Sequence, residues 1–240
     1  MKYGSLFSGI GGFDRGFDLA GFNCAWQVEC DRDCRAVLDR NFPGVPRYWD
    51  VRDFDVAKAD DVEVIIGGFP CTDISDASSR YGRAGLHGER SGLWEHFARI
   101  VDDARPRWVC IENVAGSADA SLRRWLPYVR RDLHSLGYAS LPIRMSACAV
   151  GAPYAGARIF VVAAPNSERE SIGALHAAVA QLHESPEAMR TDWGQPSPEA
   201  LGVAHRPAGG LGVVKQLRMY GNAVVPKQAE VIARLIAEVS

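Results

Sequence analysis

The sequence predicts an α/β fold with a doubly wound, mostly parallel, Rossmann-like sheet. Short apolar runs alternate with amphipathic helical stretches along the chain, and the runs end in glycine or polar residues. The expected strands are residues 3–8, 24–28, 62–66, 108–111 and 158–163. The expected helices are residues 14–20, 33–41, 93–104, 122–136 and 231–239. Because ligands of such sheets bind at the carboxyl ends of the strands, we expect the functional residues there.

Composition divides the chain into three parts. Residues 1–164 contain the strand–helix alternation and form the expected main domain, which would carry the catalytic and cofactor-binding residues. Residues 165–213 are rich in Pro, Gly, Ser and Ala, with one weak helical stretch near 175–182. This segment predicts a small irregular lobe, an ordered excursion or a partly mobile segment. Residues 214–240 end in a helix that is expected to return to the main domain.

The overall composition is that of a globular protein and argues against several classes. Of 240 residues, 47% are hydrophobic and 23% are charged, and no apolar run approaches the ~18 residues of a membrane span. The first residues lack the layout of a signal peptide. The six cysteines show neither a CxxC pair nor zinc-type Cys/His spacing, so reduced intracellular thiols without a metal are expected.

The charge is unevenly distributed. The net charge is −2, but residues 76–165 carry 12 basic side chains, all arginine, against 8 acidic ones. Such a stretch can face the phosphates of a nucleic acid. Arginines on solvated helices would give the same count, so both interpretations stay open.

A glycine-rich turn, Ser8-Gly9-Ile10-Gly11-Gly12, follows the first expected strand. Glycines there allow a tight turn and let a ligand approach the main chain at a helix N-terminus. A dinucleotide-binding GxGxxG motif would need glycine where Asp14 stands, and Asp14 would repel a diphosphate. S-adenosylmethionine has no phosphate and a cationic tail, so it suits an acidic edge better. A purely structural turn is the alternative.

Two acidic residues follow other expected strands and suit such a ligand. Glu29 could bind both ribose hydroxyls, and Asp50 could accept a hydrogen bond from an adenine amino group.

Cys71 and Glu112 are the candidate reactive groups. Cys71 follows Gly68-Phe69-Pro70 on a loop after a strand, a position typical of a nucleophile, although a lone cysteine is more often a small core residue. Glu112 follows the fourth strand and could protonate a ring nitrogen, although such a residue is more often a charge at a helix N-terminus.

Together these motifs resemble the C5 cytosine-specific DNA methyltransferases, nearly end to end. Five stretches carry the resemblance in the order of the family: SLFSGIGGFDRGFDLAGF (5–22), GGFPCTDIS (67–75), GERSGLW (88–94), IENVAG (111–116) and YGNAVVP (220–226). The compact length is similar to that of phage and bacterial members.

The resemblance implies a covalent mechanism on a flipped-out cytosine of double-stranded DNA. Cys71 would add to C6, and S-adenosylmethionine would supply the methyl group to C5. Glu112 would donate a proton or hydrogen bond to N3, Asn113 would fix the loop, and Arg158 would contact O2.

The resemblance also implies a cofactor site. Phe7 would place its ring against the adenine, while Glu29 would hold the ribose and Asp50 the adenine amino group. The full set of expected cofactor-binding residues is Phe7, Ser8, Gly9, Ile10, Gly11, Gly12, Glu29, Cys30, Asp50, Val51, Pro70, Leu93, Asn222 and Ala223.

DNA contacts are expected from two segments. The loop after Cys71 would close over DNA through Ser75, Arg80, Arg83 and Arg90. Residues 165–213 would form a short target-recognition region, with Arg190 and Arg206 among its candidate readers. Each of these side chains could equally be a surface residue.

The chain departs from the family at the QxRxR motif. Tyr154 stands in place of the glutamine and Gly156 in place of the first arginine, whereas Arg158 matches. A lost buried arginine contact is worth roughly 1.5–3 kcal/mol, and Arg144 is a candidate replacement. Cys30 also stands where an aromatic residue often stacks on adenine, so weaker cofactor stacking is expected.

Three functions therefore remain open at this point. The chain could be an active DNA methyltransferase, a weakly active DNA-binding relative, or an enzyme of the same scaffold acting on RNA, a free nucleotide or a modified cytosine. We expect a monomer without metal or membrane attachment, acting in the cytoplasm of a bacterial cell or, if phage-encoded, of the host cell.

Overall fold

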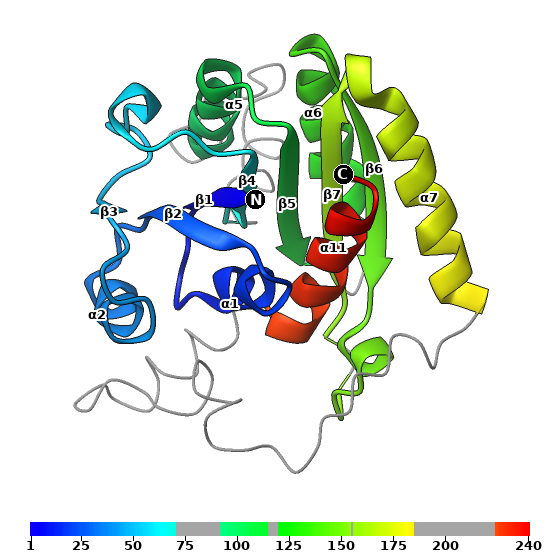
Figure 1. The fold of residues 1–240 in the computed structure, drawn as a ribbon, viewed down its shortest axis with the longest axis horizontal. Helices are drawn as coiled ribbons and strands as arrows, with labels where there is room; N and C mark the ends of the chain where they lie inside the picture. Colours follow the sequence, from blue (N-terminus) through cyan, green and yellow to red (C-terminus); the bar gives the residue numbers. More distant parts are fainter. Residues whose placement is uncertain (71–91, 115–119, 155, 185–223) are drawn as a thin grey trace.

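The computed structural model describes residues 1–70, 92–114, 120–154, 156–184 and 224–240, with the main chain alone at 120–124 and 183–184. A seven-stranded sheet in the order β3-β2-β1-β4-β5-β7-β6 forms its centre (Figure 1). The strands are β1 (Lys2–Leu6), β2 (Asn23–Val28), β3 (Arg47–Tyr48), β4 (Val64–Gly67), β5 (Trp108–Val114), β6 (Tyr138–Met145) and β7 (Arg158–Pro165). The predicted mostly parallel α/β fold is confirmed, since only the pairs that involve β7 are antiparallel.

Helices cover both faces of the sheet (Figure 1). The helical elements are α1 (Gly12–Leu19), α2 (Arg32–Asn41), α5 (Gly92–Ala104), α6 (Ala120–Ser135), α7 (Arg169–Glu184) and α11 (Pro226–Glu238), with short 3-10 turns η1 (Val56–Lys58), η2 (Ala147–Val150) and η3 (Asn166–Glu168). One apolar core lies between the sheet and α1, α7 and α11. A second core lies between the sheet and α5 and α6. Among the described residues, no helix is long and apolar enough to cross a membrane.

Two strands were not predicted, and each has a physical reason. β3 is only two residues long, Arg47 and Tyr48, and so leaves no periodic pattern. β6 contains Pro142, which argues against a central strand because proline cannot donate to the ladder. Proline is tolerated here because β6 lies at the edge of the sheet, where only β7 pairs with it.

Both helices near the end of the chain are longer than predicted. The weak stretch at 175–182 is part of the 16-residue α7, and Leu175 and Val179 belong to the core against the sheet. The first half of the segment 165–213 thus packs on the main domain, and residues 185–213 lie outside the described residues. The C-terminal helix begins at Pro226 instead of 231, because proline is favoured in the first turn, where its missing N–H costs nothing.

Helix α1 packs closely against α11 through a glycine. A Cβ added at Gly16 would lie 2.5 Å from the Pro226 carbonyl oxygen and would collide with the Ala229 side chain. The close approach therefore depends on the missing side chain, and it fixes the start of α11 beside the glycine-rich turn.

We predict that Gly16→Ala destabilises the protein by about 1–3 kcal/mol, because the added methyl group overpacks the α1–α11 contact. Urea unfolding followed by circular dichroism measures the change. Gly173→Ala is the matched control, since Gly173 is also helical but faces open space. This control should leave stability unchanged or raise it by up to about 1 kcal/mol. Equal effects of the two substitutions would contradict the packing argument.

Candidate active site

Four parallel strands, β1, β2, β4 and β5, end at one edge of the sheet, which we call the carboxyl edge. The glycine-rich turn follows β1, Glu29 follows β2 and Pro70 follows β4. Glu112 lies inside β5, which is longer than predicted. Because β7 runs antiparallel to β5, its first residue, Arg158, also lies at this edge. The fold therefore brings together residues that are far apart in the sequence.

The turn after β1 is strained and held by a carboxylate. Phe7 has a left-handed φ of 54°, which is rare for a bulky residue and is typical of functional sites. Its ring stacks on that of Phe97, with the centroids 6.4 Å apart. The Gly9 N–H donates to Glu29 Oε2 at 2.7 Å, so the ends of β1 and β2 are joined directly.

The glycines of this turn serve different purposes. Gly9 has a left-handed φ of 55°, and a Cβ added there would meet no atom within 4 Å, so a ligand could approach its main chain. Side chains at Gly11 and Gly12 would instead collide with the Phe42 ring and the Val224 carbonyl oxygen. Gly11 and Gly12 are therefore required for close packing. The sequence pattern did not distinguish this role from ligand access.

Two other residues of the turn point inward. The Ser8 hydroxyl is buried and donates to Ser5, and Ile10 is buried in the protein. Any contact that either makes with a ligand would therefore involve its main chain.

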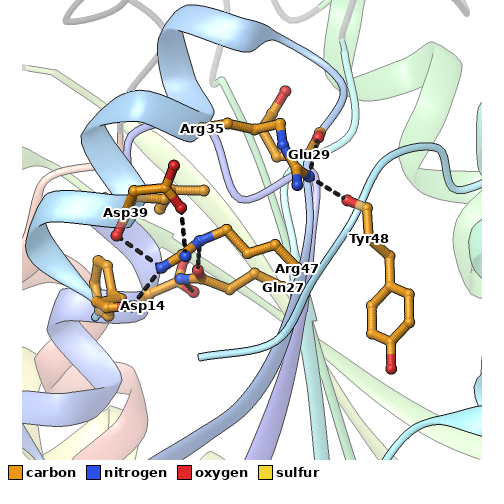
Figure 2. Close-up of polar contacts among 9 residues, drawn as sticks. Asp14, Gln27, Glu29, Arg35, Asp39, Arg47 and Tyr48 are labelled. Atoms are coloured by element: carbon orange, nitrogen blue, oxygen red, sulfur yellow. Dashed lines mark hydrogen bonds and ion pairs between the residues drawn. The ribbon is translucent and has the colours of Figure 1, made fainter. Parts of the chain in front are cut away.

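Glu29 is positioned by the elements around it (Figure 2). Its Oε1 accepts a hydrogen bond from the Asp31 N–H at 2.8 Å. Arg35 of α2 donates to the Glu29 carbonyl oxygen at 3.0 Å and to that of Tyr48 at 2.7 Å, which ties the ends of β2 and β3 together. Burial raises the pKa of Glu29, while the backbone hydrogen bonds oppose that rise. The carboxylate is thus oriented on two sides by main-chain donors.

A buried polar network lies beneath this corner of the sheet (Figure 2). Asp14 is fully buried and accepts hydrogen bonds from Gln27 Nε2 at 2.8 Å and Ser5 Oγ at 3.0 Å. Arg47 Nε donates to Gln27 Oε1 at 2.9 Å, and Arg47 Nη1 pairs with Asp39 at 2.7 Å. The carboxyl group of Asp14 therefore faces the interior, so the argument that it would repel a diphosphate at the edge does not hold.

Three expected adenine-side residues differ in their exposure. Cys30 is exposed, while the Asp50 carboxylate forms a two-pronged ion pair with Arg52. That hydrogen-bonded ion pair lowers the pKa of Asp50, so the group is an anionic acceptor. The Val51 side chain is buried in the core, so any ligand contact it makes would involve its main chain.

Glu112 and Arg158 form a buried ion pair. Arg158 Nε lies 2.9 Å from Glu112 Oε1, and the two side chains are only 13% and 8% exposed. Burial raises the pKa of Glu112 to about 7, and the positive charge of Arg158 opposes part of that rise. A carboxyl group with this pKa can hold a proton at neutral pH and present it to a ligand.

The main chain that precedes residue 71 contacts Glu112 and its neighbour Asn113. Asn113 Nδ2 donates to the Phe69 carbonyl oxygen at 3.3 Å, and the Asn113 side chain is buried. A Cβ added at Gly68 would lie 2.8 Å from Glu112 Oε2, so Gly68 leaves the space that the carboxyl group occupies. These contacts join the end of β4 to the end of β5.

Two further predicted residues line the neighbouring surface. Pro70 is exposed, and Leu93 at the start of α5 is partly buried against the second core. Arg144 does not replace the missing arginine, because it pairs with Ile159 and therefore points to the opposite face of the sheet from Arg158.

The remaining predicted site residues lie outside the described residues. They are Cys71, Ser75, Arg80, Arg83, Arg90, Arg190, Arg206, Asn222 and Ala223.

The sequence patterns did not identify the residues that position the predicted site residues. Arg35 looked like an ordinary charged residue on a helix, and nothing in its spacing linked it to the ends of two strands. The Gly67-Gly68 pair was visible after a strand, but the carboxyl group that occupies the space beside Gly68 comes from 44 positions later in the chain. In the described residues, no group of three or more His, Cys, Asp or Glu side chains could hold a metal ion.

Comparison with known proteins identifies the family. The family model for C-5 cytosine-specific DNA methylases matches residues 1–198. The chain belongs to this family.

Relatives named as type II methyltransferases agree with this assignment. M2.BsuMI of Bacillus subtilis (strain 168) is 32% identical over 167 residues, covering 68% of this chain and 42% of the relative. M.AquIA of Picosynechococcus is 32% identical over 175 residues, covering 66% of this chain and 69% of the relative. M.HhaI of Haemophilus parahaemolyticus is 26% identical, and the match covers 48% of its length. The chain therefore spans less than half the length of M2.BsuMI and M.HhaI.

Solved structures support the same fold. A protein described as a DNA modification methyltransferase encoded within an E. coli prophage is 27% identical, with a TM-score of 0.56 over 70% of this chain and 48% of that one. A mutant of DNMT2 from Spodoptera frugiperda superposes over 98% of this chain and 99% of its own chain, with a TM-score of 0.70. At 15% identity this second likeness shows the fold alone.

We predict that Arg158→Met raises the pKa of Glu112 above its value of about 7, because it removes the positive charge that stabilises the carboxylate. Carboxyl NMR titration of protein labelled with 13C-glutamate measures this directly. Arg144→Met, on the opposite face, is the control and should leave that titration unchanged. A lower or unaltered pKa in Arg158→Met would show that the ion pair does not tune Glu112.

Proposed function

We propose that this methylase is a DNA (cytosine-5)-methyltransferase that acts through a covalent adduct of Cys71. The observation that carries the proposal is the Glu112–Arg158 pair at the carboxyl edge, tied through Asn113 to the main chain two residues before Cys71. A buried proton donor beside a fixed cation, next to a cysteine loop, is the combination that attack on a cytosine ring requires.

In this mechanism the residues of the edge have complementary roles. The Cys71 thiolate adds to C6 of a cytosine that has left the duplex, and Glu112 provides the proton at N3 that makes the ring electrophilic. Arg158 donates to the O2 oxygen and compensates the charge of Glu112 once that proton has moved. Once C5 carries the methyl group, a base removes the C5 proton, the bond between C6 and the Cys71 sulfur breaks, and the N3 proton returns to Glu112.

The other half of the edge fits S-adenosylmethionine. Open space beside the Gly9 main chain admits a ligand, and the Glu29 carboxylate next to it suits a ribose diol. Asp50 is an anionic acceptor that suits an amino group, and Phe7 offers an aromatic ring. When bound, this cofactor supplies the electrophilic methyl group. The expected set is completed by Ser8, Ile10, Gly11, Gly12, Cys30, Val51, Pro70, Leu93, Asn222 and Ala223.

We further infer the setting in which the protein acts. Double-stranded DNA is the partner, contacted through Ser75, Arg80, Arg83, Arg90, Arg190 and Arg206, with target recognition assigned to residues 165–213. The names of the relatives favour a role in restriction-modification, and their sources favour the cytoplasm of a bacterial cell or of a phage host. One monomer suffices, because a single site handles a single base.

A second candidate is the same chemistry on another pyrimidine, such as RNA or a modified cytosine. The replacement of the family's glutamine and arginine by Tyr154 and Gly156 favours it. A panel of DNA, RNA and modified substrates decides between the two.

Trapping on 5-fluorocytosine tests the proposed function. The protein is incubated with S-adenosylmethionine and duplex DNA that carries 5-fluorocytosine in varied contexts. Because fluorine at C5 blocks the final elimination, we expect a complex that survives denaturant and requires both cofactor and Cys71.

Cys71→Ala is the control for this experiment and should form no complex. Failure of the folded, cofactor-binding wild type to form a complex with any DNA would overturn the proposal and direct attention to the substrate panel.

We predict that Gly68→Ala lowers the rate of methyl transfer by about 10²-fold, because the new methyl group displaces the Glu112 carboxyl from its position. Single-turnover transfer of a labelled methyl group to DNA measures the rate. Gly92→Ala is the matched control, since a Cβ there meets open space and should leave the rate unchanged. Wild-type rates in both variants would show that Gly68 does not shape the site.

A further inference from the structure

The connection between β6 and β7, residues 146–157, lies at the carboxyl edge. β7 is antiparallel to both β5 and β6, so β6 runs parallel to β5 and ends at the same edge. The described residues of the connection therefore lie at the same edge of the sheet as Arg158 and Glu112.

Helix α11 holds this connection in place. Gln228 is fully buried, and its Nε2 donates to the Met145 carbonyl oxygen at 2.9 Å and to the Gly156 carbonyl oxygen at 3.2 Å. Val225 packs with Ala147 and Ala152 in a small apolar cluster of its own. Both ends of the connection are thus fixed to the same helix, which makes it a rigid support.

Gly156 has no room for a side chain. Its φ of 36° is left-handed, and a Cβ added there would lie 2.8 Å from Tyr154 Cε2 and 2.9 Å from Ala147 Cβ. Ala147 is fully buried and cannot move aside. The Tyr154 ring occupies the space into which an arginine at position 156 would extend, so the two departures from the family motif form one structural unit.

Tyr154 itself is prominently exposed. At 54% it is the most exposed of the large apolar side chains in the described part of the chain, and it is the one that lies on this connection. One side of the ring rests against Gly156 and the rest faces solvent. An aromatic ring presented on a rigid support beside a nucleic-acid site is suited to stacking on a base.

We propose that Tyr154 stacks on a nucleobase next to the target cytosine and replaces the ionic contact of the missing arginine. The proposal rests on the proposed function. Stacking releases no counterion, whereas an arginine–phosphate contact does. The ring therefore contributes affinity that does not weaken as salt is raised.

Binding to a duplex that traps the wild type tests the proposal. Fluorescence anisotropy at several salt concentrations gives the affinity of the wild type, Tyr154→Phe and Tyr154→Leu. We expect Tyr154→Phe to bind within about twofold of the wild type and Tyr154→Leu to bind roughly tenfold more weakly, with the same salt dependence. Tyr128→Leu, another exposed tyrosine, on α6, is the matched control and should bind normally.

A second readout does not depend on affinity. With 2-aminopurine beside the target cytosine, the wild type and Tyr154→Phe should quench its emission, and Tyr154→Leu should not. Equal emission with all three proteins, or equal binding by them, would overturn the proposal. Loss of binding in Tyr154→Phe as large as in Tyr154→Leu would also overturn it, since the hydroxyl would then make the contact. Absence of trapping by the wild type would instead refute the proposed function.

Discussion

The buried pair of Glu112 and Arg158 is the interaction on which the site depends. An isolated buried carboxylate is costly, and so is an isolated buried guanidinium, so each residue is tolerated because the other lies 2.9 Å away. The pair exists only because β7 inserts in the antiparallel direction between β5 and β6, which brings its first residue to the end of β5. The direction of β7 thus places a guanidinium group beside the carboxyl group that β5 supplies.

The opposite end of the carboxyl edge is organised by main-chain contacts. Glu29 is oriented by the N–H groups of Gly9 and Asp31, and Arg35 binds the strand ends on either side. These contacts preorganise the edge before a ligand arrives, which reduces the ordering cost of binding. The buried network around Asp14 supports the same corner from below, because each polar group in it is paired with a neighbour.

Helix α11 links these two halves of the edge. Its start packs against Gly16 of α1, and Val224 lies against Gly12 of the glycine-rich turn. On its other side, Gln228 holds the connection that precedes Arg158. Helix α11 therefore contacts the elements that carry both halves of the edge, although it lies far from Glu29 and Glu112 in the sequence.

The fold class, most of the strands and the candidate groups could be predicted from the amino-acid sequence, because apolar periodicity and motif order are local properties. It did not determine β6, whose proline is acceptable only at a sheet edge, nor the inward direction of Asp14. The space that Gly68 leaves for Glu112 and the position of the Tyr154 ring beside Gly156 are seen only in the folded chain. Such contacts join residues whose proximity depends on strand order and direction, which no local pattern encodes.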